Sequence, residues 1–299
     1  MGKLLENRWV LLVIIALTWG SSFILIKKSL IGFSPYQIGA VRVAFSGLML
    51  LKIGFPAIRK MNRNTIFWLS ITGFFGNFIP MFLFPLAQEK VSSSMAGILD
   101  SLVPVFVLVF GYLFFTIKTK QSQIIGAIIG FAGAALLMFL SGGSSESSHL
   151  GYSFLVILAT ACYALAALLI KEKLSHVPAM QLSAAVFVIW IIPSLLILFF
   201  SNIFGTFQNT PLQWQATGYL AILTFMGTAA AMILYYKLIH NTSPVFASSV
   251  TYLLPLVAVT WGLLDNEPFN IWYLVGGALI LLGVYLLKER KVKHKTLKF

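Results

Sequence analysis

The amino-acid sequence predicts an all-α integral membrane protein with ten transmembrane helices, arranged as two inverted five-helix repeats with both termini in the cytoplasm. Three observations predict this fold. The 299 residues are 59% hydrophobic and only 10% charged, whereas about a quarter of the residues in a soluble domain are charged. Apolar stretches of about 20 residues, the length that a helix needs to cross the hydrocarbon core, recur along the chain. Residues 76–111 match residues 227–262 at an offset of 151, which indicates a duplication.

The first repeat holds five predicted spans. They are 9–27, 35–54, 66–87, 92–116 and 123–140. The first apolar run has no small-x-small cleavage site and continues into Lys27 and Lys28, so we interpret it as a span and not as a signal peptide. Pro35 begins the second span, because proline early in a helix removes an N–H that would have no partner there.

The second repeat holds the other five predicted spans. They are 150–170, 179–200, 214–236, 244–264 and 271–288. Pro178 precedes the seventh span and Pro244 begins the ninth. A Gly- and Ser-rich linker, 141–148, lies where the copies join. The predicted division is therefore 1–142 for the first repeat, 149–288 for the second, and 289–299 for a basic cytoplasmic tail that contacts anionic lipid.

Positive charges set the predicted orientation, because Lys and Arg collect in cytoplasmic loops. With the N-terminus inside, the cytoplasmic loops hold eleven basic residues, and Lys288 with the C-terminal tail holds six, together 17 of the 21. Lys27, Lys28 and Lys90 fall outside, and Arg42 lies within a span. Since each copy has an odd number of spans, the second copy is inverted. Inverted repeats are typical of alternating-access transporters, whose binding site lies near mid-membrane between the repeats.

Several short motifs connect the chain to a known family. They are Trp19-Gly20-Ser21-Ser22-Phe23 in the first span, Arg42 in the second, Pro104 and Pro255 in the fourth and ninth, and the pairs Gly126/Gly133 and Gly276/Gly283 in the fifth and tenth. On these residues the chain resembles the EamA-type transporters of the drug/metabolite transporter superfamily, over both halves. The resemblance implies a ten-span transporter, and similar members export amino acids and other small metabolites.

The chain departs from this family pattern in one place. The family ends the fourth and ninth spans with Gly-Glu. Glu267 fits that pattern in the second copy, whereas Thr116-Ile117-Lys118 stands there in the first. Any role that the family gives to the first acid is therefore absent or moved.

Two charged residues lie inside predicted spans, Arg42 and Asp100. At a rise of about 1.5 Å per residue they lie about 10 Å and about 12 Å below the outer surface. Each costs a few kcal/mol at the bilayer centre, so each is expected to face the bundle interior. One interpretation is a structural ion pair between them. The other is that one of them meets a charged group of the substrate, or that Asp100 takes up a proton during the cycle.

Polar and aromatic residues at similar depth complete the predicted binding site. The positions that match Arg42 and Asp100 in the second copy are Ala185 and Thr251, so the site is expected to be asymmetric, with charge towards the outside and aromatic faces towards the inside. The alternative is that the aromatic residues only pack helices together. The predicted substrate-binding residues are Trp19, Ser22, Arg42, Asn77, Asp100, Tyr163, Trp190, Thr251 and Tyr252.

Pro104 and Pro255 are predicted to lie mid-helix and to act as hinges, since each removes a backbone hydrogen bond and bends its helix. A fixed packing kink is the alternative. The glycines of 126–133 are expected to let a neighbouring helix approach closely inside the bundle, and a dimer contact is the second interpretation.

The sequence therefore predicts a secondary active transporter, an exporter of small metabolites such as amino acids, in the plasma membrane of a bacterium (its inner membrane). Two alternatives remain: an integral-membrane enzyme acting on lipids or lipid-linked sugars, and a non-transporting membrane subunit. The first needs clustered acids or histidines, but the eight acids are dispersed and the four histidines lack metal-ligand spacing. No glycine loop of an ATPase domain occurs. The expected partners are a small-molecule substrate and the bilayer; no nucleic acid, metal or cofactor is expected.

Overall fold

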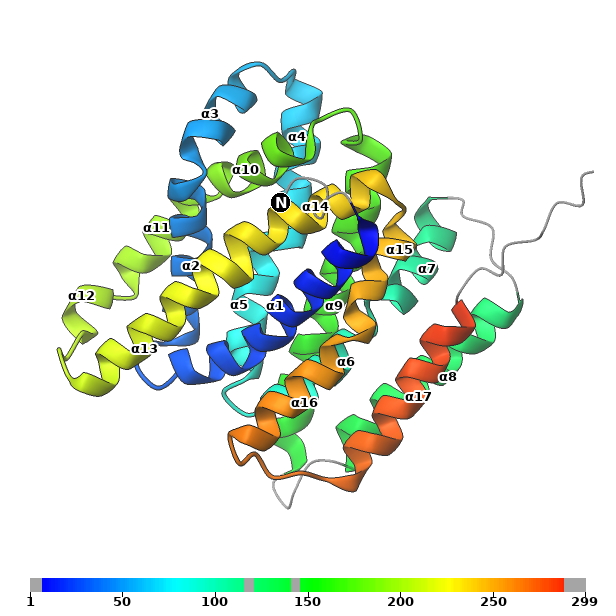
Figure 1. The fold of residues 1–299 in the computed structure, drawn as a ribbon. Helices are drawn as coiled ribbons and strands as arrows, with labels where there is room; N and C mark the ends of the chain where they lie inside the picture. The colour runs from blue at the N-terminus through cyan, green and yellow to red at the C-terminus, as the bar shows by residue number, and fades with distance from the viewer. Residues whose placement is uncertain (1–6, 116–120, 141–145, 288–299) are drawn as a thin grey trace, which may run out of the picture.

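A computed structural model describes residues 7–115, 121–140 and 146–287, and within them the chain is helical with no strand (Figure 1). Seven helices are long and apolar enough to cross a membrane, or eight if one bent pair is counted as a span. Two shorter apolar helices, Gln121–Leu137 and Ile271–Gly283, lie in the remaining predicted ranges. The predicted tail, residues 141–145 of the linker, and residues 116–120 with the divergent end of the fourth span lie outside the described residues.

Polar side chains cap the first two helices of the first half. The Asn7 side chain accepts the N–H of Trp9, and Ser34 and Gln37 form a capping box at the second helix. The second predicted span is bent by 75° at Leu50. The elements are α1 (Arg8–Ser29), α2 (Pro35–Met49), α3 (Leu51–Arg59), α4 (Arg63–Gly73), the π-helix η2 (Phe74–Phe78), α5 (Ile79–Ala87), α6 (Ser93–Asp100), α7 (Val103–Phe114) and α8 (Gln121–Leu140).

The second half follows a similar order of elements, with the short helix α12 and the turn η4 added. It contains a π-helix at the matching place and a second helical break at Trp190, the counterpart of the bend at Leu50. Its elements are α9 (Glu146–Lys173), α10 (Ala179–Ile189), α11 (Ile191–Phe200), α12 (Ile203–Thr206), α13 (Pro211–Ile222), the π-helix η3 (Leu223–Ala230), α14 (Ala231–Asn241), α15 (Pro244–Ser248), the 3₁₀ turn η4 (Ser249–Tyr252), α16 (Leu254–Leu264) and α17 (Ile271–Leu287).

The two halves pack against each other through corresponding elements. Helix α2 packs on α11 and α3 packs on α10, which is the same pair of contacts with the halves exchanged. Helices α8 and α17 run side by side at one flank of the bundle (Figure 1). Trp19 of α1 and Tyr163 of α9 each pack against both of the large buried clusters. These two rings therefore lie where the core clusters meet.

Pro104 and Pro255 do not lie in the middle of continuous helices, and that expectation is wrong in detail. Helix α6 ends at Asp100 and α7 begins at Val103, while α16 begins at Leu254 after the turn η4. Each proline therefore lies in the first turn of a new helix, where its missing N–H has no helical partner to lose. The spans are interrupted before the prolines and not bent at them. Their role as hinges stays a prediction.

Gly283→Ala is expected to lower the free energy of unfolding by about 1–3 kcal/mol, because overpacking against rigid backbone forces the helices apart. A Cβ at Gly283 of α17 would overlap the Gly126 carbonyl oxygen and the Gly130 amide of α8. Thermal unfolding in detergent measures the effect. The control is Gly218→Ala in α13, where a Cβ meets no atom within 4 Å, so the change should be neutral or stabilising by up to about 1 kcal/mol. Equal losses in the two variants would contradict this packing.

Candidate functional site

An aromatic cluster occupies the junction of the two halves. The rings of Trp19 and Tyr163 stack with centroids 6.3 Å apart and an angle of 11° between their planes. Tyr235 lies 4.7 Å from Trp19, and Phe84 lies 5.9 Å from Tyr163. The Trp19 indole N–H donates to the carbonyl of Gly227 in η3 over 3.2 Å. Trp19 and Tyr163 are only partly buried although they pack on buried residues of both clusters.

Arg42 of α2 is buried, with 3% of its surface exposed. Its Nε donates to the hydroxyl of Thr228 in η3 over 3.0 Å. Within the described residues the guanidinium forms no ion pair and no second hydrogen bond, and it has five N–H donors. A buried guanidinium with unused donors and no acidic partner suits the carboxylate of a ligand.

Asp100 lies at the end of α6, also buried, and accepts a hydrogen bond of 3.2 Å from the Thr160 hydroxyl of α9. In the described part of the chain Arg42 and Asp100 form no ion pair with each other, so the structural ion pair that the sequence allowed is not present. Both charges interact electrostatically with Tyr163. Both charges therefore lie within electrostatic range of the same ring.

Asn77 of η2 is fully buried, and its Nδ2 donates to the Tyr236 hydroxyl of α14 over 2.8 Å. Its Oδ1 has no partner. Asn77 aligns with Thr228 at the repeat offset of 151, and Trp19 aligns with Tyr163 at the offset of 144 that matches Lys27 with Lys171. The polar residues of the two π-helices thus occupy equivalent positions, and π-helical turns are frequent at functional sites.

Tyr236→Phe is expected to lower the free energy of unfolding by about 1–3 kcal/mol, because both polar atoms of the buried Asn77 amide would then lack partners. Thermal unfolding against the parent protein measures this. Tyr235→Phe is the matched control, since the Tyr235 hydroxyl makes no hydrogen bond to any described residue. A larger loss in the control would show that the Asn77–Tyr236 bond does not stabilise the site.

The other predicted site residues are placed less centrally. The hydroxyls of Ser22 and Thr251 donate to carbonyls of their own segments, those of Thr18 and Ser248. Tyr252 is partly buried against the core. Trp190 lies apart: its N–H donates to the carbonyl of Ser70, and its ring packs on Phe74 and Phe78 of η2. Sequence reasoning did not find Phe84, Thr160, Thr228, Tyr235 and Tyr236. Of these, the repeat alignment with Asn77 could have found Thr228.

Four charged side chains join the two halves at the C-terminal end of α1. We call this set, Lys27, Lys28, Asp265 and Glu267, the ion-pair cluster. The Lys27 ammonium lies 2.8 Å from Asp265 and 2.9 Å from Glu267, and Lys28 also pairs with Asp265. The Glu267 side chain is only 3% exposed. It also accepts hydrogen bonds from the backbone N–H groups of Ser93 and Ser94 and from the Ser94 hydroxyl, at 2.9–3.2 Å. The cluster therefore connects α1, the start of α6 and the segment after α16.

The ion-pair cluster is expected to make stability depend on pH below about 5. Burial alone would raise the pKa values of Glu267 and Asp265, but hydrogen bonds from the lysines, and for Glu267 from Ser93 and Ser94, outweigh it and hold both pKa values below their ordinary 4.5 and 3.8. The stabilisation is complete above these ordinary values and is lost as the pH falls through the lowered ones. Melting temperature followed from pH 7 downwards measures this. Glu267→Gln should flatten the acid limb, and an unchanged limb would contradict the assignment.

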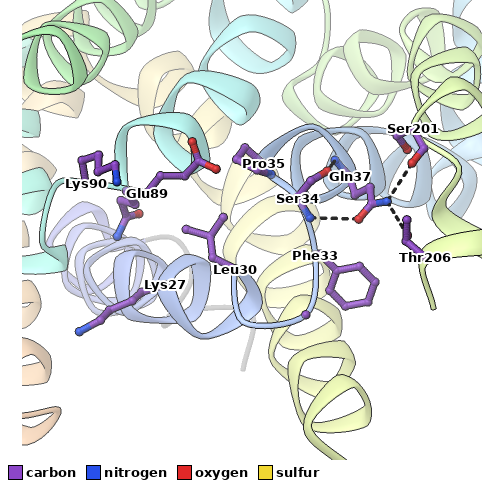
Figure 2. Close-up of a pocket in the computed structure, with 12 residues that line it drawn as sticks. Lys27, Leu30, Phe33, Ser34, Pro35, Gln37, Glu89, Lys90, Ser201 and Thr206 are labelled. Atoms are coloured by element: carbon purple, nitrogen blue, oxygen red, sulfur yellow. Dashed lines mark hydrogen bonds between the residues drawn. The ribbon is translucent and has the colours of Figure 1, made fainter. Parts of the chain in front are cut away.

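The described residues contain no group of three or more His, Cys, Asp or Glu side chains placed to hold a metal ion. The two closest acids, Asp265 and Glu267, are paired with lysines. A pocket of about 780 Å³ lies beside this cluster, at the end of α1 and the start of α2 (Figure 2). None of the nine predicted binding residues lines it.

Comparison with known proteins places these features in context. The sequence profile of the EamA-like transporter family matches residues 7–139 and 150–288. An uncharacterized transporter of Archaeoglobus fulgidus is 24% identical over 95% of this chain and 100% of its own length. The uncharacterized inner membrane transporter YedA of Escherichia coli K12 is 26% identical over 92% of this chain and 90% of its own. A protein of known crystal structure shares the fold with a TM-score of 0.62 at 14% identity, over 94% of this chain and 96% of that one.

Proposed function

Because the chain belongs to the EamA-like transporter family, we propose that it is a secondary active transporter that exports a small metabolite, such as an amino acid, across the bacterial inner membrane. The family match covers both halves of the chain, and similar proteins in two organisms are named transporters. These findings point to a transporter and not to an enzyme. The location follows from the name of the YedA protein and from the long apolar helices.

The proposed topology has ten spans in two inverted repeats, 1–142 and 149–288, with both termini in the cytoplasm. The seven long apolar helices, the bent pair α2–α3 and the two shorter helices α8 and α17 together fill the ten predicted ranges. Helices α8 and α17 pack along each other, so the two shorter helices would cross the membrane as a pair. The bias of Lys and Arg supports the orientation.

The observation that carries the proposed substrate class is Arg42, a buried guanidinium without an acid to balance it. Asp100 supplies a buried opposite charge, and the rings of Trp19 and Tyr163 supply apolar faces. An amino acid matches this arrangement, since its carboxylate suits Arg42 and its ammonium suits Asp100. In a proton-coupled cycle, Asp100 would instead carry the proton.

Alternating access requires the contacts that close each end of the site to separate in turn. At one end the ion-pair cluster joins α1 and α6 of the first half to the segment after α16 of the second. At the other end Arg8 and Trp9 of α1 pack on Phe246 of α15, with the Arg8 guanidinium 5.3 Å and the Trp9 ring 5.3 Å from the Phe246 ring. We propose that these two contacts act as the outer and inner gates.

Reconstitution in liposomes tests the proposal with a panel of labelled amino acids, with and without a proton gradient. We expect at least one amino acid to move, and Arg42→Met to stop that movement. If none moves, the amino-acid assignment fails. Asp100→Asn separates the two roles of the acid: loss of gradient-driven accumulation with retained exchange indicates proton coupling, whereas unchanged accumulation excludes it.

A further inference from the structure

The chain turns sharply where α16 ends, just before the buried acid of the ion-pair cluster. Asn266 lies in the left-handed region, with a φ of 55°. The N–H of Glu267 donates to the Gly262 carbonyl over 2.9 Å, and the N–H of Asn266 donates to the Leu263 carbonyl over 3.2 Å. These two bonds form a Schellman motif, which ends a helix with one left-handed residue. The motif brings Glu267 back alongside the last turn of its own helix.

Asn266 forms this turn through its backbone. The residue is exposed, and its side-chain amide makes no hydrogen bond to any described residue. Asparagine adopts the left-handed conformation more readily than other residues with a side chain, whereas the Cβ of an alanine there crowds the following carbonyl oxygen. The contribution of Asn266 is therefore the direction in which the chain leaves α16.

Gly262 leaves the space that the Glu267 carboxylate occupies. Helix α16 packs on α6 and on α1 (Figure 1). A Cβ at Gly262 would overlap the Ser94 hydroxyl and the Glu267 carboxylate. Both are the ends of side chains and not backbone, so a methyl group can be accommodated there by moving the carboxylate away from α6. The left-handed turn and the absent side chain together direct Glu267 at the start of α6.

The Glu267 carboxylate meets partners from two other elements. The Lys27 ammonium of α1 lies 2.9 Å away, and from α6 the N–H groups of Ser93 and Ser94 donate over 3.0 Å and 3.2 Å. The Ser94 hydroxyl donates over 2.9 Å. Further titratable side chains beside these partners are Asp265 and Lys28 of the cluster and, on α17, Tyr273, whose hydroxyl lies 3.2 Å from that of Ser92. Asp265 precedes the turn, so its position does not depend on Asn266.

The first copy does not repeat the left-handed turn as far as Phe115, the last described residue after α7. Phe115 matches Asn266 at the offset of 151, and its φ is −124°. Gly111 matches Gly262, and its carbonyl accepts the N–H of Phe115 over 3.1 Å. The glycine is therefore common to both copies, whereas the turn occurs in the copy whose next residue is an acid.

We propose that Asn266 is a positioning residue: its left-handed turn, with the space left by Gly262, holds the Glu267 carboxylate on Lys27 and on the first amides of α6. Its importance for transport rests on the outer gate proposed above, since a displaced Glu267 would release α6 from the segment after α16. Asn266 acts through Glu267 and not on a substrate.

The pH dependence of the melting temperature tests the positioning without any transport. Asn266→Ala should lose the Glu267 part of the acid limb and match Glu267→Gln, because a displaced carboxylate regains its ordinary pKa. Asn266→Gly should keep the parent profile, since glycine adopts the left-handed conformation freely. A full acid limb in Asn266→Ala, or a parent protein without a limb, would overturn the proposal.

Asn202→Ala is the matched control. Asn202 is exposed and precedes α12, has a φ of 50°, and makes no side-chain hydrogen bond as the cap of that helix. Both alanine variants strain a left-handed residue and should lower the melting temperature at pH 7 by about 2–4 °C. Asn202→Ala should nevertheless keep the acid limb, and loss of the limb in this control would refute the assignment to Asn266.

Gly262→Ala displaces the same carboxylate without straining the turn. It should therefore flatten the acid limb as Asn266→Ala does. A parent-like limb in Gly262→Ala would show that the space beside α16 does not hold Glu267 in place, and would contradict that part of the proposal.

Thiol labelling separates the position of Glu267 from its role as a gate. Cys162 is replaced by alanine, Ser22→Cys supplies a buried thiol on α1, and an impermeant maleimide is added outside intact cells. Asn266→Ala and Glu267→Gln should each raise the labelling rate about five-fold, which corresponds to about 1 kcal/mol, while Asn266→Gly and Asn202→Ala should not. If the acid limbs change as expected but no variant labels faster, the gate assignment fails and the positioning stands. Faster labelling in Glu267→Gln alone would overturn the positioning.

Discussion

Arg42→Met is expected to weaken substrate binding by about 10- to 150-fold while leaving the protein as stable as the parent or more stable. Arg42 is 3% exposed, and its guanidinium forms one hydrogen bond, to Thr228, and has no acidic partner in the described chain. An unbalanced buried charge destabilises the free protein, so its replacement by an apolar side chain of similar length relieves that cost. A ligand carboxylate would lose its charge-assisted hydrogen bonds in the same variant.

Two measurements on one preparation separate the effect of Arg42→Met on substrate binding from its effect on stability. Substrate affinity is obtained from the concentration dependence of transport or of ligand-induced thermal shift, and stability from unfolding without ligand. Arg59→Met is the control, because Arg59 lies exposed at the end of α3 and contacts the Phe55 ring. If Arg42→Met unfolds far more easily and the remaining folded protein binds normally, Arg42 is a scaffold residue and not a binding residue.

Glu267→Gln is expected to lower the free energy of unfolding by about 1–3 kcal/mol and to favour the state that is open at the outer end. Glu267 pairs with Lys27 and accepts three hydrogen bonds from Ser93 and Ser94, so its loss affects α1 and α6 together. This expected loss of unfolding free energy is smaller than the loss for a fully buried ion pair, because the Lys27 side chain is 37% exposed and water screens the interaction.

Asp265→Asn provides the comparison within the same cluster. Asp265 is 17% exposed and pairs only with lysines, so its replacement should cost less than about 1 kcal/mol. Chemical unfolding gives the two free energies, and labelling of a cysteine introduced at the buried Ser22 of α1 reports opening of the structure around it. An effect of Asp265→Asn equal to that of Glu267→Gln would show that the bonds to α6 contribute nothing.

The positions of the helices could be predicted closely because the signals that set them are local. The predicted ranges 179–200 and 244–264 coincide with helices bounded at the same residues in the structure, and Pro35 begins α2 as expected. An apolar stretch of span length and a capping residue act within a few residues of themselves. The prediction that Pro104 and Pro255 lie mid-helix was wrong, since proline fits the first turn of a new helix as well as it bends an old one.

The site could be predicted only in part. The predicted depths of Arg42 and Asp100 put them at a similar level of the bundle, and in the structure both lie within electrostatic range of Tyr163. Depth does not fix the direction of a side chain around its helix, however, and the ion pair that depth allowed does not form. Trp190 has the composition of a site residue, but it packs on Phe74 and Phe78 because the break after α10 turns its ring towards η2.

The sequence by itself determined that this is a helical membrane protein of duplicated origin and where its apolar helices lie, because hydropathy and repeat spacing are properties of contiguous segments. Only the tertiary structure decided which side chains meet. Lys27 and Glu267 are 240 residues apart, and Arg42 and Thr228 are 186 apart. Such pairs form because α1 packs on α16 and α2 packs on η3. Helix packing depends on side chains from both halves at once, so no single segment encodes it.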